Sequence, residues 1–352
     1  MGFDFKKRKN ELLEKHEAVL ICTFAQFEPN FHYLTGASVD GSYYLLTRDS
    51  ETIITSRMAR EYAEYQGFGA IVTPPPSSAN KNKSRALAET VSKILKKKHI
   101  STLAVEVDKL GTRNRLALRR FGKLKLVNAS ETLLLQRMVK DNEEIRLIRK
   151  AVQLAKQALK ELELGGKSER QAYFWLLEFF SRNHANIAFE PIVAFGIHTT
   201  FPHSVPTDTR KGRLPALIDL GARWRNYCSD LTECYIPGNC KPELAAYEEV
   251  KNIFYDIIDN SPDFRNTKDV NEFAKSCFRK RKLPELPHSL GHGVGLQVHE
   301  YPNFRRIKPM RLLPGMVLAI EPAAYGLDGG NGKFGVRYER TVLVGKKGFR
   351  EL

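Results

Sequence analysis

Short apolar runs alternate with amphipathic segments over the first third of the chain. The runs have the length and content of buried strands, and the segments between them follow the 3.6-residue period of helices. The predicted strands are residues 19–22, 43–46, 52–55, 70–72, 103–106 and 124–127. The predicted helices are residues 4–15, 57–65, 84–97 and 113–121, and residues 74–76 predict a proline-rich loop. Because strands and helices alternate, this region predicts an α/β layer.

A second pattern begins near residue 139. Asp141 is the predicted N-cap of a strongly periodic helix that ends before Gly165, and Ser168 with Gln171 predicts a capping box for the next helix. Predicted strands follow at 192–194, 216–222 and 227–236, then helices at 244–258 and 270–279, and strands at 316–323 and 334–344. The order helix, helix, strands therefore occurs twice, which predicts two similar halves.

The change of pattern predicts two domains, residues 1–128 and 139–352, joined by a linker at 129–138. A chain of 352 residues that is 42% hydrophobic fits two globular domains. No apolar run approaches the roughly 18 residues of a membrane helix, and the charged first residues do not resemble a signal peptide. The five cysteines are odd in number and scattered, which indicates reduced thiols and a cytoplasmic protein without a membrane partner.

The formal net charge of +16 has two interpretations. A basic balance is typical of proteins that bind nucleic acid. Here the charge is spread along predicted helices, as at residues 96–98 and 279–282, and the sequence has no nucleic-acid module signature. We therefore favour a solvated basic surface with no specific nucleic-acid partner, and incidental affinity for polyanions stays open.

The stretch from residue 287 to 300 holds three histidines and three glycines. Gly291 and Gly293 flank His292, so the backbone there can approach a ligand closely. Alternating apolar residues at 294–298 predict a half-buried strand with His299 near its far end. His292 and His299 differ in residue parity, so a bulge or bend at a neighbouring glycine must redirect one of the two side chains.

Two predicted hairpins carry carboxylates. With a two-residue turn at residues 224–225, Asp219 and Asp230 lie directly opposite each other, with Cβ atoms about 5 Å apart. Glu321 and Glu339 flank a glycine-rich loop and are opposed in the same way. The sequence therefore predicts two pairs of facing acids near the glycine-flanked histidine.

Like charges that face each other destabilise a sheet unless something neutralises them. A shared proton is one solution, and exposed edge carboxylates are another, although each acid lies beside a strongly apolar run. Divalent cations explain two such pairs better. Oxygen-rich ligands with one imidazole suit Mn, Co, Fe(II) or Zn in a two-metal site. Two metals about 3.5–4 Å apart can share a bridging hydroxide as nucleophile and polarise a carbonyl, so hydrolysis is the predicted reaction class.

The sequence resembles the pita-bread metallopeptidases, which include methionine aminopeptidase, aminopeptidase P and prolidase. The matching motifs occur in family order across residues 139–352, at 218–221, 229–232, 291–295 with 299–302, 320–322 and 335–339. Residues 140–145 resemble the lead-in helix of the proline-specific branch, and residues 32–36 resemble its N-terminal domain. The resemblance implies an α/β (α+β) fold. It consists of an N-terminal α/β creatinase-like domain and a C-terminal pita-bread domain, whose two similar helix–strand halves surround a curved antiparallel sheet.

The resemblance also assigns the residues that hold two divalent metal ions. The implied metal ligands are Asp219, Asp230, His292, Glu321 and Glu339. In this assignment Asp230 and Glu339 bridge both ions, Asp219 completes one, and His292 and Glu321 complete the other.

Catalytic roles follow from the same resemblance. Glu321 is also the implied proton shuttle. His299 donates a hydrogen bond to the scissile carbonyl or the tetrahedral intermediate. His203 and His288 resemble substrate-side histidines of the family, with plain polar loop residues as the alternative. Arg337 orients the site carboxylates through bidentate hydrogen bonds.

Three positions depart from the family pattern. Ala323 stands where glycine is frequent, and Arg340 stands where an acid is usual. Some dipeptide-specific members have an arginine at the position of Asn303, and here Arg305 and Arg306 follow nearby. Such an arginine holds the C-terminal carboxylate of the substrate, so strict dipeptide specificity stays open.

Three functional hypotheses result. The first is a homodimeric Xaa-Pro dipeptidase (prolidase) that cleaves before proline in di- or short peptides, with Mn or Co as the expected metal and Zn or Fe as alternatives. The second is an Xaa-Pro aminopeptidase (aminopeptidase P) that acts on longer peptides. The third is a catalytically inactive pita-bread binding module, and the intact set of five ligands argues against it.

Overall fold

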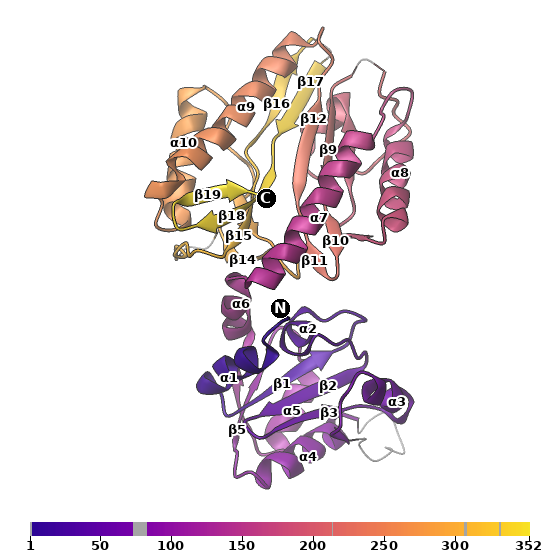
Figure 1. Cartoon of the computed structure of the whole chain (residues 1–352), viewed down its shortest axis with the longest axis vertical. Coiled ribbons are helices and arrows are strands. Elements are labelled where there is room, and N and C mark those ends of the chain that lie inside the picture. Colours follow the sequence, from indigo (N-terminus) through magenta and orange to yellow (C-terminus); the bar gives the residue numbers. More distant parts are fainter. Residues whose placement is uncertain (1, 73–82, 213, 306–307, 331) are drawn as a thin grey trace. The chain divides into compact units, whose positions relative to one another are not determined.

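A computed structural model describes residues 2–72, 83–212, 214–305, 308–330 and 332–352 (Figure 1). The chain divides into two compact units, with the division between Arg137 and Met138. The proline-rich segment 74–76 and Arg306 lie outside the described residues.

The N-terminal unit is built on a six-stranded sheet with the order β4-β3-β2-β1-β5-β6. Its strands are β1 (Ala18–Thr23), β2 (Ser42–Thr47), β3 (Ser50–Ile54), β4 (Ile71–Val72), β5 (Thr102–Val105) and β6 (Lys125–Asn128). The central strand β1 is buried along its whole length and pairs antiparallel with β2 and parallel with β5. Every strand predicted for this region overlaps an observed one.

Helices complete the N-terminal unit. They are α1 (Phe5–Lys15), α2 (Pro29–Thr35), α3 (Arg57–Tyr65), α4 (Lys83–Lys96), α5 (Thr112–Arg120) and α6 (Ser130–Met138). Apolar side chains of α4 and α5 form one core with the sheet, for example Val91 and Leu118 against Leu20 and Leu103. Helix α6 occupies most of the segment expected as a linker, and α2 was not predicted.

The C-terminal unit contains the repeated order of helices and strands. Its first half contains α7 (Asn142–Glu161), α8 (Glu169–Arg182), β7 (Asn186–Ile187), β8 (Ile192–Phe195), the 3₁₀ helix η2 (Gly196–Thr200), β9 (Ala216–Leu220), β10 (Ala222–Trp224), β11 (Tyr227–Cys228) and β12 (Leu231–Tyr235). Both predicted helix starts are confirmed, because Asp141 and Ser168 each form a capping box.

The second half repeats this order. It contains α9 (Lys241–Asn260), the 3₁₀ helix η3 (Ser261–Asp263), α10 (Thr267–Lys280), β13 (Gly291–Gly293), β14 (Glu300–Asn303), β15 (Val317–Ile320), β16 (Ala323–Gly329), β17 (Gly332–Arg337), β18 (Arg340–Gly345) and β19 (Gly348–Glu351). The predicted α/β fold with two similar halves is therefore confirmed.

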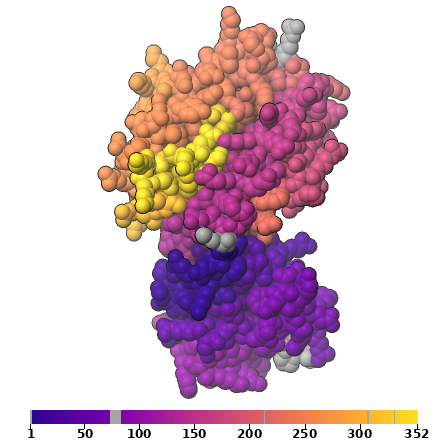
Figure 2. Space-filling view, in the orientation of Figure 1, coloured from indigo at the N-terminus to yellow at the C-terminus, as the bar shows by residue number. Residues whose placement is uncertain are grey.

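The two halves meet along their strands. One three-stranded sheet has the order β12-β9-β8, and a five-stranded sheet has the order β14-β13-β15-β18-β19. A β-bridge between Thr232 and Glu339 connects the first half to the second. At the surface, the last strands (yellow) emerge beside α7 (magenta), where Lys156 Nζ lies 2.7 Å from Glu351 Oε1 (Figure 2).

The register of the first hairpin differs from the prediction. Asp219 lies opposite Thr232, because the turn is at Arg225 and Asn226 and not one residue earlier. Both turn residues have positive φ, as a two-residue type I′ turn requires. The prediction that Asp219 faces Asp230 directly is therefore wrong, and the two acids are offset along the strands.

Two further features bear on the class of protein. Within the described ranges, no helix is long and apolar enough to cross a membrane. All five cysteines lie in the described part of the chain, where they are buried and form no disulfide.

The capping box of α8 provides a test of the local fold. Replacing Ser168 by alanine removes the side chain that accepts the Gln171 N–H, so we expect the free energy of unfolding to fall by about 1 kcal/mol. Urea denaturation followed by circular dichroism measures this change. Glu178→Ala on the same helix removes only a surface ion pair with Arg182 and serves as the control. Equal stabilities of the two variants would contradict the assignment.

Candidate metal centre

The five predicted ligand residues gather in the C-terminal unit. They lie on or beside five strands, namely Asp219 in β9, Asp230 before β12, His292 in β13, Glu321 after β15 and Glu339 between β17 and β18. Three overlapping groups have ligand atoms within 4.8 Å of one another: Asp219 with Asp230 and Glu339, His292 with Glu321 and Glu339, and Asp230 with His292 and His299. The fold thus brings the predicted ligands from both halves to one place.

His292 presents one ring nitrogen to the acids. Its Nδ1 lies 3.1 Å from the Gly293 carbonyl oxygen and donates to it, which leaves Nε2 as the atom with a free electron pair. Nε2 lies 3.5 Å from Asp230 Oδ2 and 3.8 Å from Glu321 Oε1. Burial, together with the neighbouring His299, lowers the pKa of His292 to about 3, so the ring is neutral and suited to bind a cation.

The carboxylates are crowded and almost without solvent. Burial raises the pKa of Asp230 well above its usual value, and the charges of Glu339, Asp219 and Glu321 raise it further. Burial and Asp219 raise the pKa of Glu339 to about 7. Asp219 Oδ1 is buried and has no hydrogen-bond partner. A buried, unpartnered carboxylate oxygen amid like charges fits a divalent cation, which satisfies the oxygen and offsets the repulsion.

Arg337 and Thr232 hold two of these acids. Arg337 Nη2 donates to Asp219 Oδ2 at 2.5 Å, and its Nε donates to Thr232 Oγ1 at 3.0 Å. Thr232 in turn donates to Glu339 Oε2 at 2.7 Å. The expected bidentate contact is wrong, because one guanidinium nitrogen reaches Asp219 and a hydroxyl relays the other contact. Thr232 was not predicted as a site residue, although its parity with Asp230 placed both on one face of the strand.

His288 lies near one carboxylate oxygen of Glu321, and His292 lies near the other. Its Nδ1 is 3.4 Å from Glu321 Oε2 and donates to the Ser289 carbonyl oxygen at 2.8 Å. Its Nε2 accepts from the hydroxyl of Tyr325 at 3.0 Å, and the same hydroxyl oxygen accepts from Arg337 Nη1 at 2.7 Å. Burial lowers the pKa of His288 to about 4. No local pattern in the sequence indicated Tyr325.

The ring of His299 packs against the ring of His292. The ring centroids of His299 and His292 are 4.2 Å apart, and the ring planes are nearly perpendicular. The pairing of β13 with β14 shifts register between His292 and Gly293, so the predicted bulge is confirmed. The predicted strand over residues 294–298 is wrong. At Gly293 a Cβ would lie 2.0 Å from the Tyr301 carbonyl oxygen, and this close backbone crossing is where the strand ends.

The remaining candidates, His203 and Arg305, are exposed residues whose charges act on the histidines of the cluster. His203 is exposed on the loop after η2. Burial lowers the pKa of His299, Asp219 opposes this effect, and the charge of His203 lowers it further. Arg305 is exposed, and its Nη2 donates to the Pro287 carbonyl oxygen at 3.2 Å. Both residues therefore lie beside the histidine-rich segment, on the side that solvent reaches.

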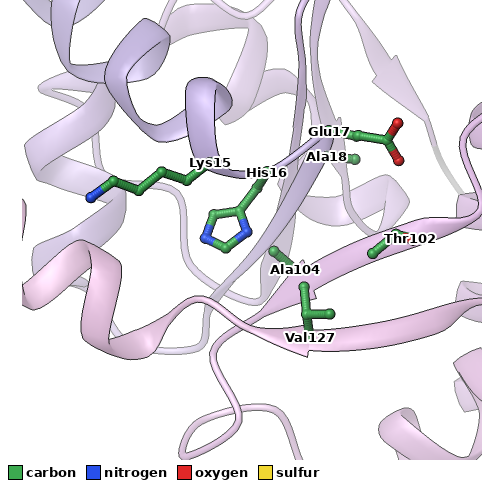
Figure 3. A pocket seen from close by; sticks show the side chains of 7 residues that line it. All are labelled: Lys15, His16, Glu17, Ala18, Thr102, Ala104 and Val127. Atoms are coloured by element: carbon green, nitrogen blue, oxygen red, sulfur yellow. The ribbon is translucent and has the colours of Figure 1, made fainter.

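A cavity in the N-terminal unit is separate from this cluster. Its lining residues are Lys15, His16, Glu17, Ala18, Thr102, Ala104 and Val127 (Figure 3). The single imidazole points toward Thr132, with His16 Nε2 3.3 Å from Thr132 Oγ1. These seven residues contain one carboxylate and one histidine, too few to hold a divalent cation without further ligands.

Comparison with known families agrees with this geometry. The model of metallopeptidase family M24 matches residues 146–346, and the Creatinase/Prolidase N-terminal domain matches residues 8–139. The chain belongs to metallopeptidase family M24 and carries this second domain at its N-terminal side. The predicted resemblance to the pita-bread metallopeptidases is thereby confirmed.

Individual relatives cover nearly the whole chain. An Xaa-Pro dipeptidase from Pyrococcus horikoshii is 29% identical over 98% of this chain and 95% of its own length. The solved prolidase of the same organism has a TM-score of 0.82 at 28% identity and covers 99% of this chain and 97% of its own. An X-Pro aminopeptidase from Thermotoga maritima has a TM-score of 0.83 at 25% identity, over 98% and 97% of the two chains.

The raised carboxyl pKa values predict protons that leave when a cation binds. The pKa of Glu339 is raised to about 7, which predicts a partly protonated carboxyl group near neutral pH in the metal-free protein, and burial raises the pKa of Asp230 and of Glu321 in the same direction. Titration with Mn²⁺ at pH 6.5 therefore releases protons, because the ligands bind in the ionised form. Calorimetry in two buffers of different ionisation enthalpy counts them.

The pH dependence supplies the control. At pH 8.5 a larger share of these carboxyl groups is ionised before the cation arrives, so fewer protons are released than at pH 6.5. His292 adds none at either pH, since its pKa is lowered to about 3. A proton release that is absent at pH 6.5, or that grows with pH, would contradict the protonated state of the metal-free cluster.

Proposed function

We propose that this protein is an Xaa-Pro dipeptidase that holds two divalent metal ions in the cluster of five ligands. The observation that carries the proposal is the convergence of four acids and one neutral imidazole, with the buried Asp219 Oδ1 left unpartnered. The named Xaa-Pro dipeptidase and prolidase relatives, which match over nearly the full chain, support the substrate class.

The ligand set favours hard or borderline cations. Asp230 and Glu339 each belong to two of the three overlapping groups of ligand atoms, so we propose that they bridge two ions. Carboxylate oxygens with one imidazole suit Mn or Co, with Zn or Fe as alternatives. When bound, such a pair of ions supplies an activated water and polarises the carbonyl of the substrate.

Glu321 is the proposed proton carrier of the chain. Burial and the charge of Glu339 raise its pKa well above the usual value, and Arg337 opposes this effect. A carboxyl group with a raised pKa accepts a proton and returns it near neutral pH. His288 Nδ1, 3.4 Å from Glu321 Oε2, limits the positions that this carboxyl group can take.

His299 and His203 border the open side of the cluster. His299 is exposed and perpendicular to the ligand ring of His292, so one of its nitrogens can donate to the oxygen of a peptide carbonyl placed there. His203 contributes a second imidazole from the loop after η2. We propose that both contact the substrate, whereas Arg337 acts by orienting Asp219.

Recognition of a dipeptide requires a cation for its free carboxylate. Asn303 occupies the position where some family members have an arginine, and its Oδ1 accepts the Arg305 N–H at 2.8 Å. The charge of Arg305 opposes burial and Glu339 in setting the pKa of Glu321, so its guanidinium lies within electrostatic reach of the cluster. We propose that Arg305 binds the substrate carboxylate.

Cleavage of longer peptides is the second candidate. The neutral side chain of Asn303 favours it, because nothing charged at that position fixes the end of a dipeptide. The similarity to an X-Pro aminopeptidase structure favours it as well. A homodimer and a cytoplasmic location remain predictions from the resemblance and from the reduced thiols.

Steady-state kinetics on paired substrates tests the proposed function. After chelation and dialysis the enzyme is expected to be inactive, and Mn²⁺ or Co²⁺ should restore hydrolysis of Met-Pro. The kcat/KM for this dipeptide should exceed the value for a tripeptide with proline in second position. Arg305→Ala should raise KM for the dipeptide without a similar effect on the tripeptide.

A matched variant separates local charge from overall charge. Arg311→Ala removes an arginine of the same loop region whose backbone bridges to Asn266, the N-cap of α10, so its kinetics should equal those of the wild type. Higher kcat/KM for the tripeptide, with dipeptide KM unchanged in Arg305→Ala, would establish the aminopeptidase instead. Full turnover in a verified metal-free sample would rule out both.

His299 provides a test of the catalytic roles. If it donates a hydrogen bond to the developing oxyanion, His299→Ala lowers kcat by roughly 10²–10³-fold. Metal content measured by mass spectrometry should stay at the wild-type value, because His299 is not a proposed ligand. Loss of an ion in this variant would make His299 a ligand, and an unchanged kcat would remove it from the mechanism.

A further inference from the structure

A fully buried ion pair lies behind the histidine-rich loop. Lys140 Nζ is 2.8 Å from Glu300 Oε1, and the side chains are 0% and 2% exposed. Lys140 Nζ also lies 3.2 Å from the Met138 carbonyl oxygen and donates to it. Two charges are costly to bury and rarely stabilise a fold more than apolar residues of equal size, so a pair in this place requires an explanation beyond stability.

The lysine is fixed independently of the loop. Its backbone N–H donates to the Gly315 carbonyl oxygen at 2.9 Å, and the preceding Val139 forms a β-bridge with Met316. The following residue, Asp141, is the N-cap of α7. The ammonium group is thus anchored between the start of a 20-residue helix and the second half of the unit.

The loop wraps around the glutamate. Glu300 Oε2 accepts the Gln297 N–H at 3.3 Å, which closes the turn that contains His299. The Gly295 N–H donates to the Gln297 carbonyl oxygen at 3.0 Å. A Cβ at Gly295 would lie 2.3 Å from Glu300 Oε1 and 3.0 Å from Lys140 Cε, so the backbone passes directly over the ion pair.

We propose that the Lys140–Glu300 ion pair is a positioning device that sets the His299 imidazole against the cluster. His299 is the neighbour of Glu300 in the chain and lies inside the turn that the Glu300 carboxylate closes. Residues 294–299 form no strand, and the backbone hydrogen bonds to Val317 and Cys228 hold only Val294 and Gly295 at the start of the segment. The buried charge pair restrains the other end of the segment, next to His299, and links it to the start of α7.

A directed charge pair suits this task better than apolar packing. An apolar side chain at position 300 tolerates several rotations, whereas an ammonium group and a backbone N–H together fix both oxygens of one carboxylate. The ion pair therefore determines which way the turn faces. Because catalysis depends on placing a donor within fractions of an ångström, a small displacement of the turn lowers the rate without changing the fold.

The inference rests on the proposed function of His299 and is tested with the full-length protein. Glu300→Gln keeps an acceptor for the Gln297 N–H and removes the charge. The double variant Lys140→Met with Glu300→Gln removes both charges, so that no buried charge is left unpaired if a single variant fails to fold. We expect kcat for Met-Pro to fall on the order of 10–100-fold with little change in KM and metal content.

Two further readouts distinguish positioning from general destabilisation. Hydrogen–deuterium exchange over residues 294–301 should accelerate in the double variant, with or without metal, while exchange in α9 stays unchanged. In a His299→Ala background the same substitutions should lower kcat no further, because the residue through which they act is gone. Arg281→Met, which removes ion pairs between α9 and α10, is the control and should leave the loop and kcat unaffected.

A folded double variant with wild-type exchange and wild-type kcat would overturn the proposal. Additive losses with His299→Ala would also overturn it, because the ion pair would then act on another part of the site. If the wild type hydrolyses no Xaa-Pro peptide, the proposed function fails, and the exchange experiment alone decides whether the ion pair orders the loop.

Discussion

Repulsion among buried carboxylates is the constraint on which the C-terminal unit depends. Asp219, Asp230, Glu321 and Glu339 bring four acids into a space with almost no solvent, and burial raises the pKa of each. If all four carboxyl groups are ionised, the fold needs positive charge to compensate them, and Arg337 supplies one positive charge. The arrangement is therefore explained by the cations that it can hold and not by the stability of the chain alone.

The surrounding residues divide into those that hold acids and those that face solvent. Arg337 donates to Asp219 and Thr232 donates to Glu339, so the orientation of these two carboxylates is fixed before any cation binds. His299 and His203 lie on the open side. This division between a rigid interior and a reactive edge is typical of metal sites whose outer partners tune the ligands.

Much of the fold and of the ligand set could be predicted from the sequence. Periodicity located the strands of the N-terminal unit, and the capping residues Asp141 and Ser168 marked helix starts, because these signals are local. The predicted hairpin register was wrong because the register depends on which two residues adopt positive φ. Arginine has no particular preference for positive φ, so the sequence did not mark Arg225 as a turn residue. Tyr325 and the Lys140–Glu300 pair were missed because only tertiary folding brings these residues to their partners.

The distribution of the ligands along the chain has a mechanical consequence. Positions 219 and 339 belong to different halves, yet both contribute atoms to one group within 4.8 Å. A cation that binds this group in the folded unit and not in the unfolded chain would stabilise the fold by its binding free energy. Such a cation would also join the two halves, so the free energy of unfolding of the unit would rise with the concentration of the metal ion.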